Sequence, residues 1–149
     1  MKITVEIEIN APKENVWAII TDIENSVETI SGIDKIEIIH QPDNTVIGLK
    51  WKETRTIFGK PATETMWITE ANENDYYKTR AESNGAIYQT ILKLTAIENV
   101  TTLTMEFSSK AVSTKGKIMA FIFSALLKRS MKKLIYQDLV DIKNVTLNQ

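Results

Sequence analysis

The sequence contains no cysteine and only one histidine, His40. Without cysteine the chain can form no disulfide and carries no thiol nucleophile. Zinc sites need about three or four Cys, His or carboxylate ligands, and no carboxylates are clustered at the spacing that calcium prefers. We therefore expect no metal. His40 precedes a turn and has no recognisable Asp or Ser partner, so an exposed histidine is favoured over a general base.

The sequence also lacks a long apolar run, a glycine-rich loop and a large net charge. Residues 118–127 form the longest apolar stretch, well short of the roughly 20 residues that cross a bilayer. The formal charge of −1 gives no overall attraction for nucleic acid. No phosphate loop or G-x-S-x-G motif is present, so we expect no cofactor. The N-terminus resembles a charged strand and not a signal peptide, which predicts a cytoplasmic protein.

The 149 residues suit one domain over residues 1–149, large enough to bury a real core. Charge is unevenly spread along this domain. From Lys110 onward there are eight basic and two acidic residues, which leaves ten basic and seventeen acidic residues before it. The C-terminal segment is therefore the cationic face of the molecule.

Most of the chain before this segment has the two-residue alternation of strands. Residues 2–10 predict a first strand with Ile3, Val5, Ile7 and Ile9 on one face. Pro12 at a helix start and Thr21-Asp22 at its end predict a short helix, with a second over 24–30. Six further strands are expected at 34–40, 46–58, 62–71, 76–83, 86–96 and 100–109. Asn84-Gly85 is a strong hairpin signal. Strands grouped apart from helices indicate an α+β fold.

Residues 113–147 predict one long helix, which contains no proline. At about 100° per residue one side carries a mostly apolar stripe: Ala120, Phe123, Ser124, Leu127, Met131, Leu134, Ile135, Asp138 and Ile142. The other side carries Lys128, Arg129, Lys132 and Lys133. The first half of this helix is apolar on nearly all sides, because the side opposite the stripe is apolar as well. That side carries Ile118, Met119, Ile122, Ala125 and Leu126. Either the protein covers that half, or it is an exposed patch suited to a membrane surface or a dimer contact.

Several local patterns resemble the START-related helix-grip superfamily, also called SRPBCC, in its polyketide cyclase/dehydrase and lipid-transport branch. They are the first strand running into Ala11-Pro12-x-x-x-Val16-Trp17, then Trp51-x-Glu53-x-Arg55 with Gly59 after it, and Asp138-Leu139-x-x-Ile142-Lys143 near the end. The resemblance implies a curved, antiparallel, seven-stranded sheet around the long C-terminal helix, with two short helices after the first strand. It also implies a hydrophobic cavity for lipids, isoprenoid quinones or polyketide-like molecules. Members include binders, carriers and cyclases, so the fold alone does not define the function.

Trp51, Glu53 and Arg55 fall on one face of the strand expected at 46–58, together with Ile47 and Leu49. In one interpretation the three line the cavity, where Arg55 holds an acidic or keto group of a ligand and Glu53 acts as a base or orients Arg55. In the other, the strand twists and both charges lie at the cavity mouth or in solvent, since burying such a pair is costly without good hydrogen bonds. Asp138 either lines the cavity as an acid with a raised pKa or reaches a backbone amide or basic side chain near the sheet.

Apolar faces of the later strands and the long helix supply the remaining candidate walls. The predicted ligand-binding residues on these faces are Tyr88, Thr90, Leu92, Met105, Phe107, Leu127, Met131 and Ile135. Such stripes more often fill a core, but the family resemblance favours a pocket. The main hypothesis is a non-catalytic binder or carrier of a small apolar molecule. The alternative is a cofactor-independent cyclase or dehydratase that uses Glu53, Arg55 and Tyr88. A third option is peripheral membrane or partner contact through the basic helix.

Overall fold

The computed structural model describes the side chains of residues 1–115, 117 and 127–149. Seven strands form one antiparallel sheet in the order β1-β7-β6-β5-β4-β3-β2. They are β1 (Lys2–Ile9), β2 (Lys35–His40), β3 (Lys50–Ile57), β4 (Lys60–Asn72), β5 (Tyr76–Ser83), β6 (Ala86–Ile97) and β7 (Val100–Ala111). The helices are α1 (Lys13–Thr21), the 3₁₀ turn η1 (Ile23–Asn25), α2 (Ser26–Thr29) and α3 (Thr114–Leu147). The predicted α+β helix-grip layout is confirmed.

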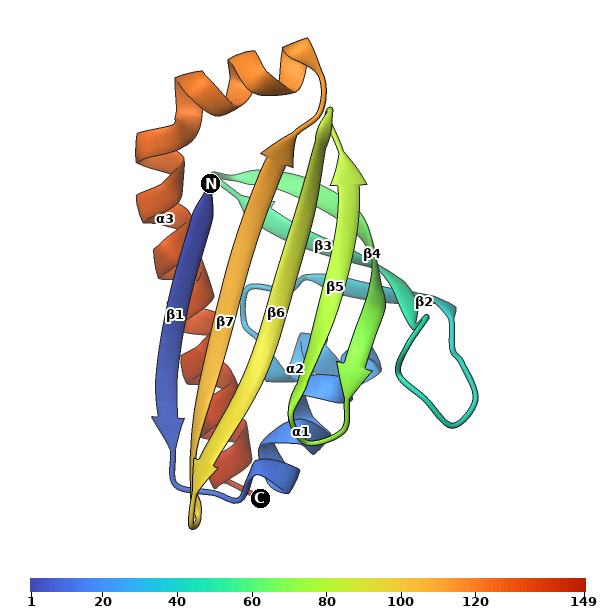
Figure 1. Cartoon of the computed structure of the whole chain (residues 1–149), viewed down its shortest axis with the longest axis vertical. Coiled ribbons are helices and arrows are strands. Elements are labelled where there is room, and N and C mark those ends of the chain that lie inside the picture. The colour runs from blue at the N-terminus through green and yellow to red at the C-terminus, as the bar shows by residue number, and fades with distance from the viewer.

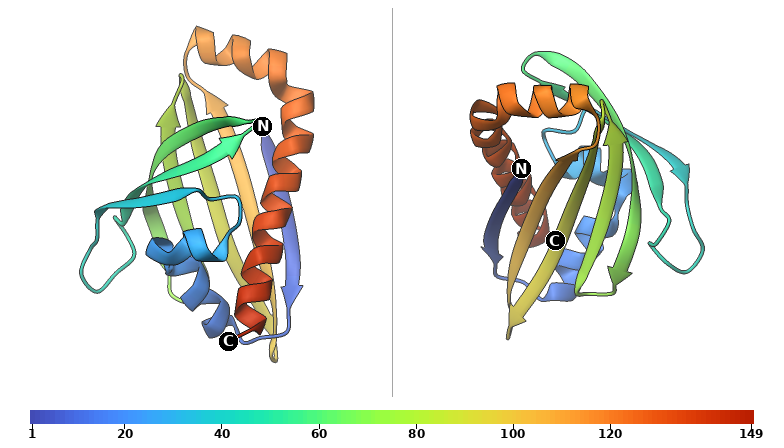
Figure 2. Two further views of the ribbon diagram at one scale, coloured as in Figure 1. Left: turned by 180° about the vertical axis from the view of Figure 1, so that it is seen from behind. Right: turned by 45° about the horizontal axis from the view of Figure 1, so that its top comes forward.

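The sheet curves, and all the helices lie on its concave side (Figures 1 and 2). The long helix α3 runs beside β1, while α1 and α2 lie across one end of the concave face (Figure 2). Each strand alternates between the two faces; in β1, Ile3, Val5 and Ile9 are buried and the residues between them are mostly exposed. The core therefore fills the space between the concave face and the helices.

Two hairpins turn through residue pairs with positive φ, as type I′ turns require. Asn84 and Gly85 have φ of 50° and 74°, and Phe58 and Gly59 have φ of 52° and 75°. The first pair is the predicted Asn-Gly turn. In the second, Pro61 was expected to belong to the turn but lies in β4, paired with Thr56.

The strand expected to begin at Val46 begins at Lys50. Gly48 has a φ of 92° and breaks the extended backbone, so Ile47 leaves the face that it was expected to share with Leu49. Ile47 is 46% exposed, while Leu49 is 3% exposed. The expectation for Ile47 was therefore wrong, because a left-handed backbone residue reset the alternation.

Two buried hydrogen bonds attach the two ends of α1 to the sheet. The Tyr77 hydroxyl on β5 donates to the Ile20 carbonyl at the end of α1, at 3.0 Å. The Thr101 hydroxyl on β7 donates to the Ala11 carbonyl before α1, at 2.7 Å. Pro12 occupies the position before the first helical residue, one residue earlier than expected. These contacts hold α1 across one end of the concave face.

Helix α3 carries the predicted inward stripe over its described second half. Ile135, Asp138 and Ile142 are buried, and Leu139, which the stripe did not include, is fully buried beside them. The basic residues Lys128, Arg129, Lys132 and Lys133 are exposed on the other side. The predictions for Ala120, Phe123 and Ser124, and for the apolar first half of the helix, concern side chains outside the described residues.

Candidate ligand cavity

A cavity of about 380 Å³ lies between the concave face of the sheet and the helices. Its described walls are mostly apolar side chains from β3 to β7, α1, α2 and α3. The volume is within the range of roughly 300–1,000 Å³ that small-molecule sites occupy. The interior is therefore not a completely filled core.

All eleven predicted ligand-binding residues line this cavity: Trp51, Glu53, Arg55, Tyr88, Thr90, Leu92, Met105, Phe107, Leu127, Met131 and Ile135. The exposed fraction of these side chains differs from one part of the cavity wall to another. Trp51 and Leu92 are almost inaccessible, whereas Tyr88, Phe107 and Leu127 are half-buried. Their binding of a ligand stays a prediction, but their placement around one cavity is a property of the fold.

Some wall residues were not predicted. The short helices and the loop after them contribute Ile19, Ile20, Ile23, Ile30 and Ile33, and β4 contributes Glu64 and Met66. The isoleucines could have been found from the amphipathic pattern of residues 16–33. Glu64 could have been found from hairpin pairing, since it lies directly opposite Glu53 in the register of β3 and β4.

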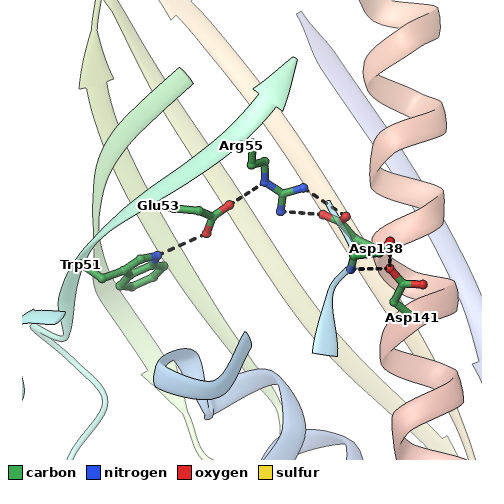
Figure 3. A network of polar contacts seen from close by, with 6 residues as sticks. Trp51, Glu53, Arg55, Asp138 and Asp141 are labelled. Carbon is green, nitrogen blue, oxygen red and sulfur yellow. Dashed lines mark hydrogen bonds and ion pairs between the residues drawn. The ribbon is translucent and has the colours of Figure 1, made fainter. Parts of the chain in front are cut away.

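Arg55 forms the centre of a polar cluster inside the cavity (Figure 3). Its Nε donates to Glu53 Oε1 at 2.6 Å, and its two terminal nitrogens donate to the two carboxylate oxygens of Asp138 at 3.1 and 2.8 Å. The Trp51 indole Nε1 donates to the other Glu53 oxygen at 3.3 Å. The cluster thus joins β3 to α3, and Asp138 reaches a basic side chain of the sheet, as one of its two interpretations expected.

The cluster is largely shielded from water. The side chains of Glu53, Arg55 and Asp138 are 10%, 21% and 8% exposed. Burial disfavours the charged guanidinium, but hydrogen bonds to Asp138 and the charges of Glu53 and Asp138 outweigh this and raise the pKa of Arg55. Burial raises the pKa of Asp138, and the bonds from Arg55 offset that effect only in part. Glu53 and Arg55 therefore face inward, against the interpretation that placed them in solvent.

Gly32 makes room for this cluster. A Cβ atom at position 32 would lie 3.0 Å from the nearer terminal nitrogen of Arg55 and 3.5 Å from Asp138 Oδ1. Contacts of 3.0 Å are tighter than nine in ten real Cβ contacts, and bonds to two carboxylates hold the guanidinium in place. A side chain at position 32 would therefore have to displace the guanidinium by a few tenths of an ångström.

A second polar group lies in the half-buried part of the wall. The Ser83 hydroxyl on β5 donates to Glu64 Oε1 on β4 at 2.9 Å. Burial and the nearby charge of Glu64 raise the pKa of Tyr88, which stacks on Phe107 with ring centroids 6.0 Å apart. At the buried end, burial also raises the pKa of Tyr77. Both phenols therefore stay neutral at physiological pH.

The cavity is chemically suited to hold a molecule by apolar contact and to orient it through a few oxygens. The single histidine, His40, is exposed on β2 and is not among the residues that line the cavity. Within the described ranges, no group of three or more His, Cys, Asp or Glu side chains could hold a metal ion. In the same part of the chain, no helix has the length and apolar character to span a membrane.

Residues 1–139 match the family model described as polyketide cyclase / dehydrase and lipid transport. The chain belongs to this family. None of the curated protein sequences matches the chain.

Several solved structures share the fold at low sequence identity. The protein TTHA0849 of Thermus thermophilus has a TM-score of 0.83 at 13% identity, with 99% of this chain and 98% of that one covered. The ZhuI aromatase/cyclase of Streptomyces sp. R1128 gives 0.74 at 12% identity, covering 98% and 93%. Norcoclaurine synthase of Thalictrum flavum, in complex with dopamine and hydroxybenzaldehyde, gives 0.73 at 14% identity, covering 100% and 87%. At these identities the likeness concerns the fold alone.

Proposed function

We propose that this protein of the polyketide cyclase/dehydrase and lipid-transport family binds or carries a small, mostly apolar molecule in the cavity between the sheet and α3. The observation that supports this most strongly is the cavity itself, about 380 Å³ with mainly apolar walls. Filling such a space with side chains would have been stabilising, since cavities in cores cost free energy in proportion to their size. A space left open beside a hydrogen-bonded polar cluster is typical of a ligand site.

The proposal can be tested with N-phenyl-1-naphthylamine, a neutral apolar dye whose fluorescence rises in apolar surroundings. We expect saturable, one-to-one binding. Thr90→Phe, on the cavity wall in the middle of β6, should weaken it at least tenfold by filling the space. Thr95→Phe adds the same ring at an exposed position of the same strand and should leave binding unchanged. Equal binding by both variants would show that the dye does not enter the cavity.

A second candidate function is a cofactor-independent cyclase or dehydratase. It is favoured by the position of Glu53, Arg55 and Tyr88, all of which line the cavity. A carboxylate could remove the proton between two ketone groups, and a phenol could donate to the developing oxyanion. The test is turnover of a linear poly-β-ketone thioester analogue, followed by the absorbance of the aromatic product. Glu53→Gln should abolish turnover; product formation equal to that without protein removes this candidate.

Peripheral contact with an anionic membrane is a further proposal for how a carrier would deliver its ligand. Lys128, Arg129, Lys132 and Lys133 are exposed together on α3, and basic residues near an anionic surface contribute about 1 kcal/mol each. Replacing all four with Glu should abolish co-sedimentation with vesicles rich in phosphatidylserine. Co-sedimentation that is unaffected by these substitutions would rule out this surface.

A further inference from the structure

The described side chains that line the cavity include more carboxylates than cations. Among the described residues that line it, three are carboxylates, Glu53, Glu64 and Asp138, and one is a cation, Arg55. The sequence has no ionisable side chain at positions 116 and 118–126, which are the positions of α3 whose side chains are not described. The Met1 amino group lies at the exposed edge, where it donates to the Ser109 carbonyl. The side chains of the wall thus carry a net negative charge.

Arg55 already forms hydrogen bonds and ion pairs with two carboxylates of the protein. Its guanidinium makes three charge-assisted hydrogen bonds, one to Glu53 and two to Asp138, out of five N–H groups in all. Gly32 lies against the nitrogen that bonds Asp138 Oδ1. A carboxylate at the two remaining N–H groups would bring a third negative charge to a guanidinium that already compensates Glu53 and Asp138, and like charges at short range repel each other. We therefore do not expect Arg55 to hold an acidic group of the ligand.

Glu64 forms no ion pair with any residue that the structure describes. It accepts the Ser83 hydroxyl at 2.9 Å, a bond that does not neutralise its charge. It also lies directly opposite Glu53 in the β3–β4 register, and facing residues on one side of an antiparallel pair have Cβ atoms about 5 Å apart. Like charges in this position repel each other. A positive or hydrogen-bond-donating group between them would relieve that repulsion.

We propose that the cavity selects apolar molecules that carry an ammonium or hydroxyl group, bound by Glu64 and the free lone pairs of Glu53, and excludes carboxylates of the same skeleton. This inference rests on the proposed binding function and specifies the class of its ligand. The apolar part of the ligand lies against Leu92, Met105 and Phe107. The donor group lies at the Glu53–Glu64 pair. Arg55 is the one cation among the described side chains of the wall, and it already compensates Glu53 and Asp138.

Three probes that share one ring system test the selection. They are 2-(2-naphthyl)ethylamine, 2-(2-naphthyl)ethanol and 2-naphthylacetate, titrated by isothermal calorimetry at pH 7 and constant ionic strength. We expect the amine to bind most tightly, the alcohol next, and the carboxylate at least tenfold more weakly than the amine. Glu64→Gln should reduce the preference of amine over carboxylate at least threefold. Glu6→Gln, which removes the same charge from an exposed position of β1, should leave it unchanged.

The outcomes separate this inference from the proposed function. Carboxylate binding as tight as that of the amine, or an equal change of preference in both glutamate variants, overturns the charge selection while binding itself stands. If none of the three probes binds and N-phenyl-1-naphthylamine does not bind either, the proposed function fails and the inference fails with it. Binding of the neutral dye with rejection of all three probes overturns the inference alone.

Discussion

At the scale of single residues, Arg55 is the side chain on which the polar centre of the cavity depends. It compensates two carboxylates from different elements, Glu53 on β3 and Asp138 on α3. Buried ion pairs add little net stability compared with apolar residues of the same volume, but removal of one partner leaves an uncompensated charge. The cluster is therefore sensitive to the loss of any single member.

Replacement of Arg55 by Met should lower the free energy of unfolding by about 3 kcal/mol, because Glu53 and Asp138 lose their shared cation. The measurement is urea denaturation at pH 7. Arg80→Met is the matched control, since Arg80 pairs with Glu82 on an exposed face and should change stability by less than about 0.5 kcal/mol. Equal effects of the two substitutions would contradict a structural role for the cluster.

Gly32→Ala tests the tight contact beside Arg55. The added Cβ would lie 3.0 Å from a guanidinium nitrogen, and overpacking of this kind costs about 1–3 kcal/mol. The loss should largely disappear in an Arg55→Met background, because the two positions are in contact and their effects are not additive. A loss of the same size in both backgrounds would mean that the cost comes from the backbone at position 32 instead.

At the scale of elements, the strand alternation and turn chemistry predicted most boundaries, and the errors have local causes. Tyr76–Ser83 is the strand expected, because the residue types and the following Asn-Gly turn agree. The start of β3 was missed because the extended pattern of residues 46–49 conceals the left-handed backbone of Gly48. The inward direction of Glu53 and Arg55 follows from alternation. Their partner Asp138, 83 residues beyond Arg55, could be placed only once helix and sheet were packed together.

A second attachment of α3 involves Asp141, which accepts two bonds from Ser31, in the loop after α2. The Ser31 backbone N–H and hydroxyl lie 2.9 and 2.7 Å from Asp141 Oδ2, and the Gln137 amide donates to Oδ1 at 2.9 Å. Burial acts to raise the pKa of Asp141, but these hydrogen bonds exceed it and lower the pKa. The carboxylate therefore stabilises the fold in its ionised form.

Asp141→Asn should lower the free energy of unfolding by about 1 kcal/mol at pH 7, as expected for loss of charge-assisted hydrogen bonds at a partly exposed site. Because the folded pKa is lowered, this contribution is present above the unfolded value of about 3.9. It is lost as pH falls through the folded pKa. Urea titrations from pH 7 to about pH 2 should show the gap between the two proteins closing once the pH falls below about 3.9. A gap independent of pH would refute the ionic origin, and Asp43→Asn, in an exposed loop, should show no gap.

At the scale of the whole molecule, the cavity arises because three separate parts of the chain enclose one space. The sheet supplies the curved wall, the short helices close one end, and α3 runs along the open side (Figure 2). The strand and helix stripes predicted which residues would face inward. They could not show that the inward side chains leave about 380 Å³ between them, because that volume depends on the distance between elements and not on the periodicity within any of them.

Native mass spectrometry of the freshly purified protein, before and after organic extraction, shows whether the cavity holds a small apolar molecule. We expect an added mass that extraction removes, or uptake of one apolar molecule per chain from a lipid and quinone panel. Thr95→Phe should behave like the unsubstituted protein, and Thr90→Phe should show neither the added mass nor the uptake. A protein that stays at its apo mass throughout, or a Thr90→Phe variant that retains the full adduct, would mean that the cavity is not a ligand site.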